Sequence, residues 1–278
     1  MNHSFLALFL ILCCFFSQQN KAQTPEQYTA HNKGKIYFFW GGNRDMYSKS
    51  DIHFVGEDYD FTLYDVTAHD KPNGWHVNYI NPARMTIPQT NARVGYFISD
   101  HYNISLGVDH MKYVMNQNIR VHYSGYYPNP ETYNENPSAD ELTLDEDFLT
   151  FEHTDGLNYV DAEFSRVDDI SALFKIRNTD KIQLNVYEGA GVGVLYPRSN
   201  TKLLGKARYD EFHVAGMGVS LKTGLYLTFF KHFFIAEEIK GGFIKMNDIR
   251  TTASKADQAE QQFWFLQNML AIGGIIQF

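Results

Sequence analysis

The last sixteen residues, 263–278, constrain the fold of this chain most, because hydrophobic and polar side chains alternate along them as in a strand. Counting back in twos from the terminal Phe278 gives one nearly apolar face: Ile276, Gly274, Ile272, Leu270, Asn268, Leu266 and Trp264. A strand of this length crosses a bilayer when it is tilted. We therefore expect an all-β fold, a closed antiparallel transmembrane β-barrel. Phe278 would end its closing strand and mark that strand for the barrel-assembly machinery.

The first residues predict export. Residues 5–16 form an apolar run that is too short to span a membrane, and a short polar segment and Ala22 follow it. This is the pattern of a signal peptide that is cleaved near Ala22. Cys13 and Cys14 raise the alternative of a lipid anchor, but neither follows the small residue that we expect before a lipid-attached cysteine. The predicted organisation is a signal peptide at residues 1–22, an N-terminal segment at residues 23–34 and a barrel at residues 35–278, in a Gram-negative cell outer membrane.

Composition limits the chemistry. Both cysteines lie in the predicted signal peptide, so the remaining chain offers no disulfide, zinc-thiolate site or cysteine nucleophile. The chain has 32 Asp and Glu against 24 Lys and Arg, an acidity that argues against nucleic acid as a partner. After the signal peptide, no apolar run approaches the roughly 18 residues of a membrane helix. The 22 Phe and 18 Tyr favour a barrel with aromatic belts.

Eight segments alternate as strands do. In residues 211–229 one face is apolar and the other is small or polar, which a membrane barrel turns outward and inward respectively. A soluble β-sandwich, the alternative, would turn its apolar faces inward. The expected strands are residues 35–47, 89–99, 103–117, 158–168, 182–196, 211–229, 233–247 and 263–278.

With an even number of strands, the first and last strands begin and end on the same side of the membrane. If Phe278 ends in the periplasm, the short turns near Asp100 and Lys231 also lie there. The longer segments then lie outside the cell: 48–88, 118–157, 197–210 and 248–262. One of them contains a further extended piece, residues 52–66, which either prolongs the strands above the membrane or adds a hairpin that makes ten strands.

Alternation sends several charged side chains into the lumen. A three-residue turn at residues 100–102 would place Arg93 opposite Asp109. An eight-stranded barrel has just enough interior for side chains to fill it, and charges buried there must be paired. We expect structural ion pairs in two clusters, formed by Arg93 and Asp109 and by Lys222, Glu238 and Lys240; Asp161, Glu163 and Ser165 also face inward.

Three charged residues do not fit a lipid-facing wall. Strict alternation turns Glu188 and Glu237 toward lipid, where a carboxylate is costly. We expect a one-residue bulge to turn each of them inward, and a carboxylate exposed on the wall would refute this. Lys112 also faces outward, near the outer leaflet, where it could meet lipopolysaccharide phosphates or extend to the interface. Outer-membrane lipid and lipopolysaccharide are thus expected partners.

The first external segment is rich in acidic residues. Asp58, Asp60, Asp65 and Asp70 could offer carboxylate oxygens to a calcium-like cation. Their spacing matches no recognised ligand loop, and a solvated acidic surface is the simpler interpretation. We therefore expect no metal and no cofactor.

One pair of residues suggests catalysis. His122 and Ser124 resemble the His-x-Ser pattern of outer-membrane lipid A deacylases, in which the serine is the nucleophile and the histidine its base. The pair follows the third strand rather than lying late in the barrel, and spacing fixes no third member. The sequence therefore assigns no catalytic residue, and His122 and Ser124 remain candidates.

Several stretches together resemble a group of outer-membrane β-barrel proteins of Bacteroidetes: GYFISDHYNISLGVDHMKYVM (95–115), GAGVGVLYPRSNT (189–201) and TFFKHFFIAEEIKGGF (228–243), with the terminal Phe278. The resemblance implies a small barrel and carries over no catalytic residues. We expect a structural or surface-interaction protein with a lumen filled by side chains. The alternatives are an outer-membrane lipid A hydrolase and a narrow pore for small or apolar solutes.

Overall fold

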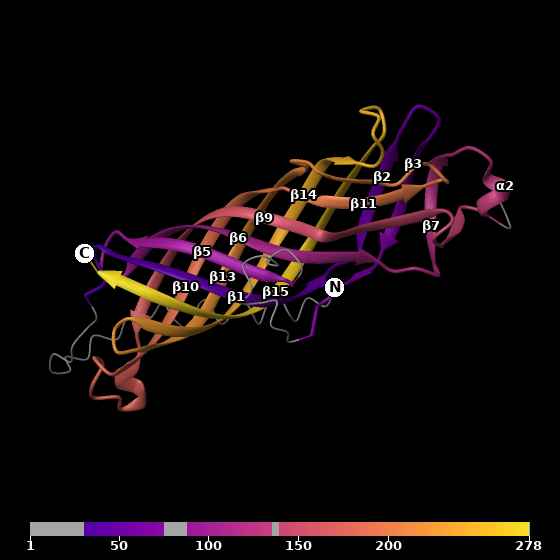
Figure 1. Ribbon diagram of the computed structural model, residues 1–278. Helices are drawn as coiled ribbons and strands as arrows, with labels where there is room; N and C mark the ends of the chain where they lie inside the picture. The colour runs from indigo at the N-terminus through magenta and orange to yellow at the C-terminus, as the bar shows by residue number, and fades with distance from the viewer. Residues whose placement is uncertain (1–30, 75–87, 135–138, 278) are drawn as a thin grey trace.

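The computed structural model describes residues 31–74, 88–134 and 139–277. Within them, eight long strands form a ring in which each strand pairs antiparallel with the next and the last pairs with the first. The expected all-β, closed, eight-stranded barrel is confirmed (Figure 1). Its strands are β1 (Lys35–Tyr47), β5 (Thr90–Phe97), β6 (Tyr102–Met115), β9 (Leu149–Asp169), β10 (Ile182–Leu195), β13 (Gly216–Phe229), β14 (Phe233–Arg250) and β15 (Gln258–Gln277).

The closing strand, β15, joins the two ends of the ring. It pairs with β14 on one side and with the whole of β1 on the other, from Lys35 opposite Gln277 to Tyr47 opposite Phe265. Gly41 permits this close approach, because a Cβ atom there would lie 2.6 Å from the carbonyl oxygen of Leu270. The strand begins at Gln258, five residues earlier than predicted. Phe278 and the predicted signal peptide lie outside the described residues.

The barrel wall is apolar outside and polar inside. Large apolar side chains are exposed around the ring, whereas charged and amide side chains on the alternate positions are buried. Soluble proteins show the reverse arrangement, and a closed barrel with an apolar outer band is the form in which strands cross a bilayer. The soluble sandwich is therefore excluded. The outward residues include Val94, Leu106, Phe164, Val192, Leu221 and Ile272.

The turn of the β5–β6 hairpin lies one residue earlier than predicted. Arg93 pairs with Gly107, and Asp109 pairs with Asn91, so the predicted register is wrong by two residues. The backbone amide of Ile98 donates a hydrogen bond to the carbonyl oxygen of Tyr102, so residues 99–101 form the turn. A shift of two residues keeps every side chain on its face, so Arg93 and Asp109 both still point into the lumen.

The expected bulges at the two outward glutamates are absent. Glu188 pairs with Arg166 and Thr223, and Glu237 pairs with Leu225 in an unbroken register. Both glutamates are exposed on the wall, so the bulge hypothesis is wrong. The positive side chain of Arg166 beside Glu188 supplies one physical reason why that carboxylate is tolerated outside.

An irregularity occurs between β6 and β9 instead. From Met111 to Tyr113 the register advances two residues on β6 but four on β9, from Leu157 to His153, so the extra residues lie on β9. Met111 and Tyr113 keep the predicted inward side, and Lys112 is buried rather than exposed on the wall.

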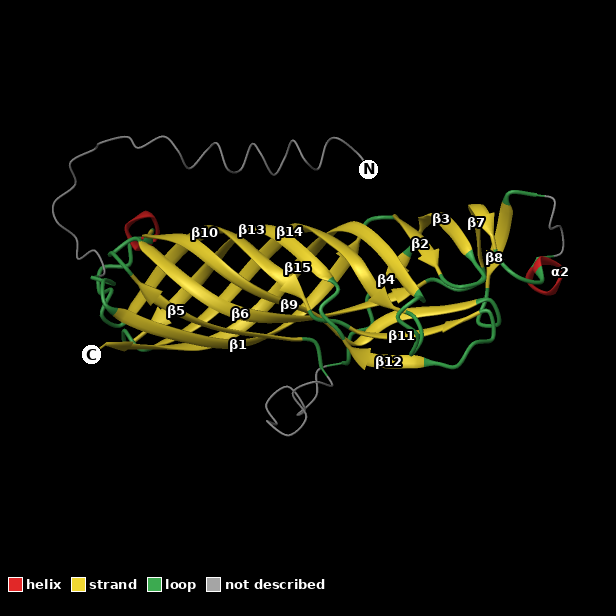
Figure 2. Ribbon diagram, turned by 90° about the horizontal axis from the view of Figure 1, so that it is seen from above, coloured by secondary structure: helices red, strands yellow, loops and turns green. Residues whose placement is uncertain are grey.

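At the end opposite the C-terminus, the sheet continues beyond the ring as an external extension (Figures 1 and 2). Strand β2 pairs with the start of β15, and the sheet runs on through β3 and β7 to β8. Residues 52–66 thus prolong the sheet above the barrel and leave the ring at eight strands. The extension contains β2 (Ser50–Val55), β3 (Asp60–Val66), β4 (Ala68–His69), β7 (Ile119–Tyr126), α2 (Pro130–Tyr133), β8 (Glu141–Leu144), β11 (Arg198–Leu203) and β12 (Tyr209–Phe212).

Shorter connections lie at the end of the barrel that holds the C-terminus (Figure 2). They include the β5–β6 and β13–β14 turns and a segment between β9 and β10 that contains the 3-10 helix η3 (Ser171–Phe174). Among the described residues, no helix has the length and apolar character to cross a membrane.

Candidate functional site

The middle of the lumen is filled by seven charged side chains, each at most 5% exposed. They come from β5, β6, β9, β13 and β14, so they meet only because the ring is closed. Three of them are cations and four are carboxylates. We call this group the ion-pair layer: Arg93, Asp109, Asp161, Glu163, Lys222, Glu238 and Lys240.

Glu163 lies at the centre of the ion-pair layer. Its carboxylate lies 2.9 Å from Nη1 of Arg93 and 2.8 Å from Nζ of Lys240, and it also contacts Lys222. Arg93 further contacts Asp161 at 2.7 Å. Burying a charged group is costly, and these mutual contacts compensate for that cost.

The structure brings all five predicted lumen residues into this single network rather than two clusters. Lys240 contacts Asp109, and Arg93 lies 3.8 Å from the same carboxylate. Lys222 lies 3.1 Å from Glu238. The connection between the two predicted clusters is made by Asp161 and Glu163 on β9. Their inward position could be predicted from alternation, but their partners could not.

A layer of amide side chains lies next to the ion-pair layer. Asn91 donates a hydrogen bond to Asp109 at 2.7 Å and another to Gln267 at 2.9 Å. Gln267 and Gln89 both donate to the buried carboxylate of Asp45. Asn and Gln carry no distinctive spacing, so the sequence does not predict this layer beyond the inward side of its residues on or beside β1, β5 and β15.

Aromatic side chains close the lumen toward the external extension. Phe54 and Phe61 stack at 5.2 Å between ring centroids, and Phe61 also contacts Phe148 at 5.7 Å. These rings belong to one buried cluster that continues down to Tyr113 and Tyr159 in the barrel strands. The extension therefore has its own apolar core, which we call the external core.

A buried histidine lies in the external core. Nδ1 of His153 lies 2.8 Å from Oγ of Ser199, and its ring contacts Phe151 and Tyr113. Burial lowers the pKa of His153 from its ordinary 6.5 to about 4. Because this histidine and Ser199 are both buried, the pair is closed to a lipid substrate.

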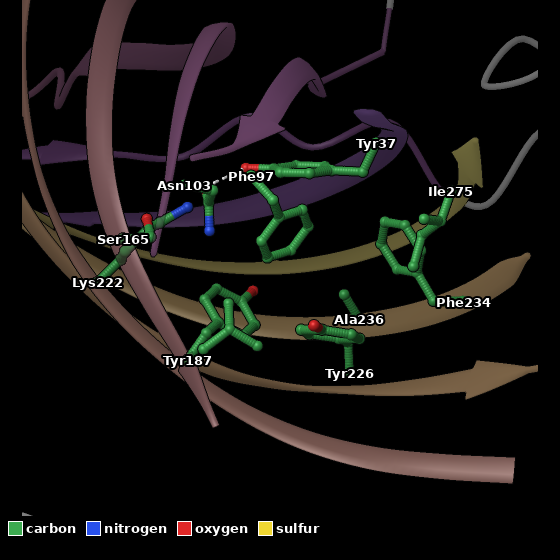
Figure 3. A pocket seen from close by; sticks show the side chains of 11 residues that line it. Tyr37, Phe97, Asn103, Ser165, Tyr187, Lys222, Tyr226, Phe234, Ala236 and Ile275 are labelled. Carbon is green, nitrogen blue, oxygen red and sulfur yellow. Dashed lines mark hydrogen bonds between the residues drawn. The ribbon is translucent and has the colours of Figure 1, made fainter. Parts of the chain in front are cut away.

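The opposite end of the lumen, near the C-terminus, contains a pocket of about 430 Å³ including its open mouth. Five aromatic rings surround it, as Figure 3 shows: those of Tyr37, Phe97, Tyr187, Tyr226 and Phe234. Lys222 of the ion-pair layer also lines it, together with Asn103, Ser165, Val167, Ala236 and Ile275. The hydroxyl of Tyr37 donates a hydrogen bond to Asn103 at 2.9 Å. We call this the terminal pocket.

The catalytic candidates lie on β7 in the external extension, away from the lipid-facing wall. The hydroxyl of Ser124 forms a hydrogen bond of 2.8 Å with that of Tyr64. His122 lies 3.8 Å from Glu141 and 3.9 Å from Asp140. The contacts described for His122 and Ser124 thus lead to different partners, and the geometry assembles no nucleophile with its base here.

The four candidate metal ligands are also separated by their partners. Asp58 contacts Lys206 at 2.9 Å and Asp60 contacts His53 at 2.8 Å. Asp65 pairs with Lys49, and Asp70 accepts a hydrogen bond from Gln89. Within the described ranges, no three His, Cys, Asp or Glu residues are grouped so that they could hold a metal ion.

Comparison with known proteins finds no matching protein-family model and no matching curated protein. Solved structures of outer-membrane β-barrel proteins are similar to this chain, and OprG, Neisserial surface protein A and Ail are three of them. OprG of Pseudomonas aeruginosa is 8% identical and has a TM-score of 0.38, with 90% of this chain and 99% of OprG covered. Neisserial surface protein A is 11% identical with a TM-score of 0.34, covering 88% and 98%. Ail of Yersinia pestis is 12% identical with a TM-score of 0.31, covering 88% and 99%.

Proposed function

We propose that this chain is an integral outer-membrane β-barrel protein with a closed lumen and a structural or surface-interaction role. The ion-pair layer carries this proposal, because its seven buried side chains occupy the middle of the lumen and are held by one another. The external core closes the same lumen at its outer end. A barrel filled in this way does not leave room for general diffusion of solutes.

The external extension is the part of the molecule that supports a surface role. Its segments hold 19 Asp and Glu against 9 Lys and Arg in residues 48–74, 116–134, 139–157, 197–214 and 247–262. The acidity of the whole chain is therefore concentrated at this end. A surface of one sign attracts partners of the opposite charge and increases their rate of encounter. We infer that the extension meets cationic partners at the cell surface.

The closed lumen predicts that the protein does not conduct. Liposomes that contain the purified, refolded chain are expected to swell in sugar solutions no faster than empty liposomes, because the ion-pair layer leaves no continuous water path. A general porin, reconstituted at the same protein-to-lipid ratio, is the positive control. Swelling at the rate of the porin liposomes would contradict the closed lumen and favour the pore alternative.

The orientation can be tested on intact cells. An epitope inserted after Glu131 in α2 is expected to bind antibody without permeabilisation, because α2 belongs to the external extension. The same epitope inserted after Leu173 in η3 is the matched control, since that turn lies at the opposite end and should be labelled only in permeabilised cells. The reverse labelling pattern would show that the barrel has the opposite orientation.

A further inference from the structure

The terminal pocket is the feature of the barrel that a filled, purely structural lumen does not require. Its wall is built from residues of all eight strands of the ring, and the rings of Tyr37, Tyr187 and Tyr226 face a common space (Figure 3). A concave, largely apolar site with a few polar groups is the usual form of a small-molecule site. The ion-pair layer closes its inner end, so a molecule must enter and leave by the same mouth.

One polar group in the terminal pocket is left without a partner. Ser165 is 2% exposed, and its Oγ makes no hydrogen bond within the described part of the chain. A buried hydroxyl normally has a partner, because leaving it without one costs free energy. Ser165 lines the pocket, so a ligand hydroxyl could supply the missing hydrogen bond.

The charges around the pocket indicate that its ligand is uncharged. Lys222, the lining cation, already contacts the carboxylates of both Glu163 and Glu238. A ligand anion would have to displace one of these contacts and add to a layer in which carboxylates outnumber cations. A ligand cation would be placed against Lys222. Either charge would be buried without a free counter-ion, which is costly.

We propose that the terminal pocket binds a small uncharged molecule that carries one aromatic ring and a hydroxyl group. Its ring packs among Tyr37, Tyr226 and Phe234, where aromatic pairs are favourable. Its hydroxyl bonds to Ser165 Oγ. This inference does not depend on the proposed surface role, because the pocket lies at the other end of the barrel.

The test uses 4-methylphenol as the probe and the full chain, refolded in detergent and titrated by calorimetry. Saturable binding is expected for 4-methylphenol, with at least tenfold weaker binding of 4-methylbenzoate, its anionic counterpart. Ser165→Ala is expected to weaken 4-methylphenol binding about tenfold and to leave the binding of toluene unchanged, since one hydrogen bond is lost. Failure of 4-methylphenol to bind, or equal binding of the benzoate, would overturn the proposal.

Substitutions at two neighbouring positions test whether the probe binds in the terminal pocket or on the outer wall of the barrel. Ala236→Phe places a ring inside the pocket and is expected to abolish binding, whereas Ile235→Phe places the same ring on the exposed outer face of the same strand and should leave binding intact. Heat-modifiable migration on a gel confirms that each variant is folded. If Ala236→Phe does not fold, Ala236→Leu provides the smaller obstruction. Binding that survives the inward substitution would place the probe elsewhere and refute the pocket.

Discussion

Lys240→Met is expected to lower the free energy of unfolding by about 3–5 kcal/mol, because it removes a cation from a buried network of ion pairs and leaves its carboxylate partners buried. Lys240 contacts the carboxylates of Asp109, Asp161 and Glu163 and is 1% exposed. Methionine preserves much of the volume but removes the charge, which leaves four carboxylates facing two cations. Urea titration of the refolded chain, followed by heat-modifiable migration, measures the loss.

The matched control is Lys245→Met on the same strand. Lys245 is exposed on the outer side of β14, so this substitution is expected to change stability by no more than about 0.5 kcal/mol. A second substitution, Asp109→Asn, should restore part of the stability that Lys240→Met loses, because it removes one of the carboxylates that has lost its partner. Equal stability of the wild-type chain and Lys240→Met would show that the ion-pair layer does not hold the barrel together.

Acid is expected to destabilise the external core through His153. The pKa of this buried histidine is about 4 in the folded chain and 6.5 as its ordinary value. Between these pH values the unfolded chain binds a proton that the folded chain does not, so stability falls as the pH decreases. The loss is about 1.4 kcal/mol per pH unit and reaches about 3 kcal/mol near pH 4. Above about pH 7 this histidine makes no pH-dependent contribution.

The measurement is the difference in unfolding free energy between the wild-type chain and His153→Gln at several pH values. Other groups titrate in both chains and cancel in the difference, as does the packing that the substitution removes. The wild-type advantage should be constant above pH 7 and should shrink by about 3 kcal/mol toward pH 4. A difference that stays flat from pH 7 to pH 4 would show that His153 titrates alike in the folded and unfolded chains.

The predicted strands and lumen residues show how much of the structure can be predicted from local sequence patterns. Seven of the eight strands could be placed from alternation to within a few residues, and the inward side of Arg93, Asp109 and Lys240 could be predicted in the same way. The second half of β9 was also predicted, but its first half, from Leu149, was assigned to a loop. That part pairs with β6 and β11 above the barrel, so its strand character depends on partners far away in the sequence.

The predictions that failed required knowledge of spatial neighbours. Glu188 and Glu237 were assigned to bulges because an outward carboxylate is costly, yet the unbroken ladders of backbone hydrogen bonds on both sides keep them outside. The irregularity opposite Lys112 arises from extra residues on β9, so the residues of β6 carry no signal for it. A turn one residue earlier than predicted moved the partner of Arg93 from Asp109 to Gly107 without changing the face of either side chain.

The sequence by itself determined the alternation of apolar and polar side chains with a period of two residues. This alternation determines the class of fold, the lipid-facing side of each strand and the set of side chains in the lumen. These follow from alternation, which is a local property of each strand. Only the tertiary structure decided which lumen residues meet, how the external extension closes one end and where the terminal pocket opens at the other. Those contacts depend on the tilt and stagger of strands around a closed ring, which bring together residues that no local pattern relates.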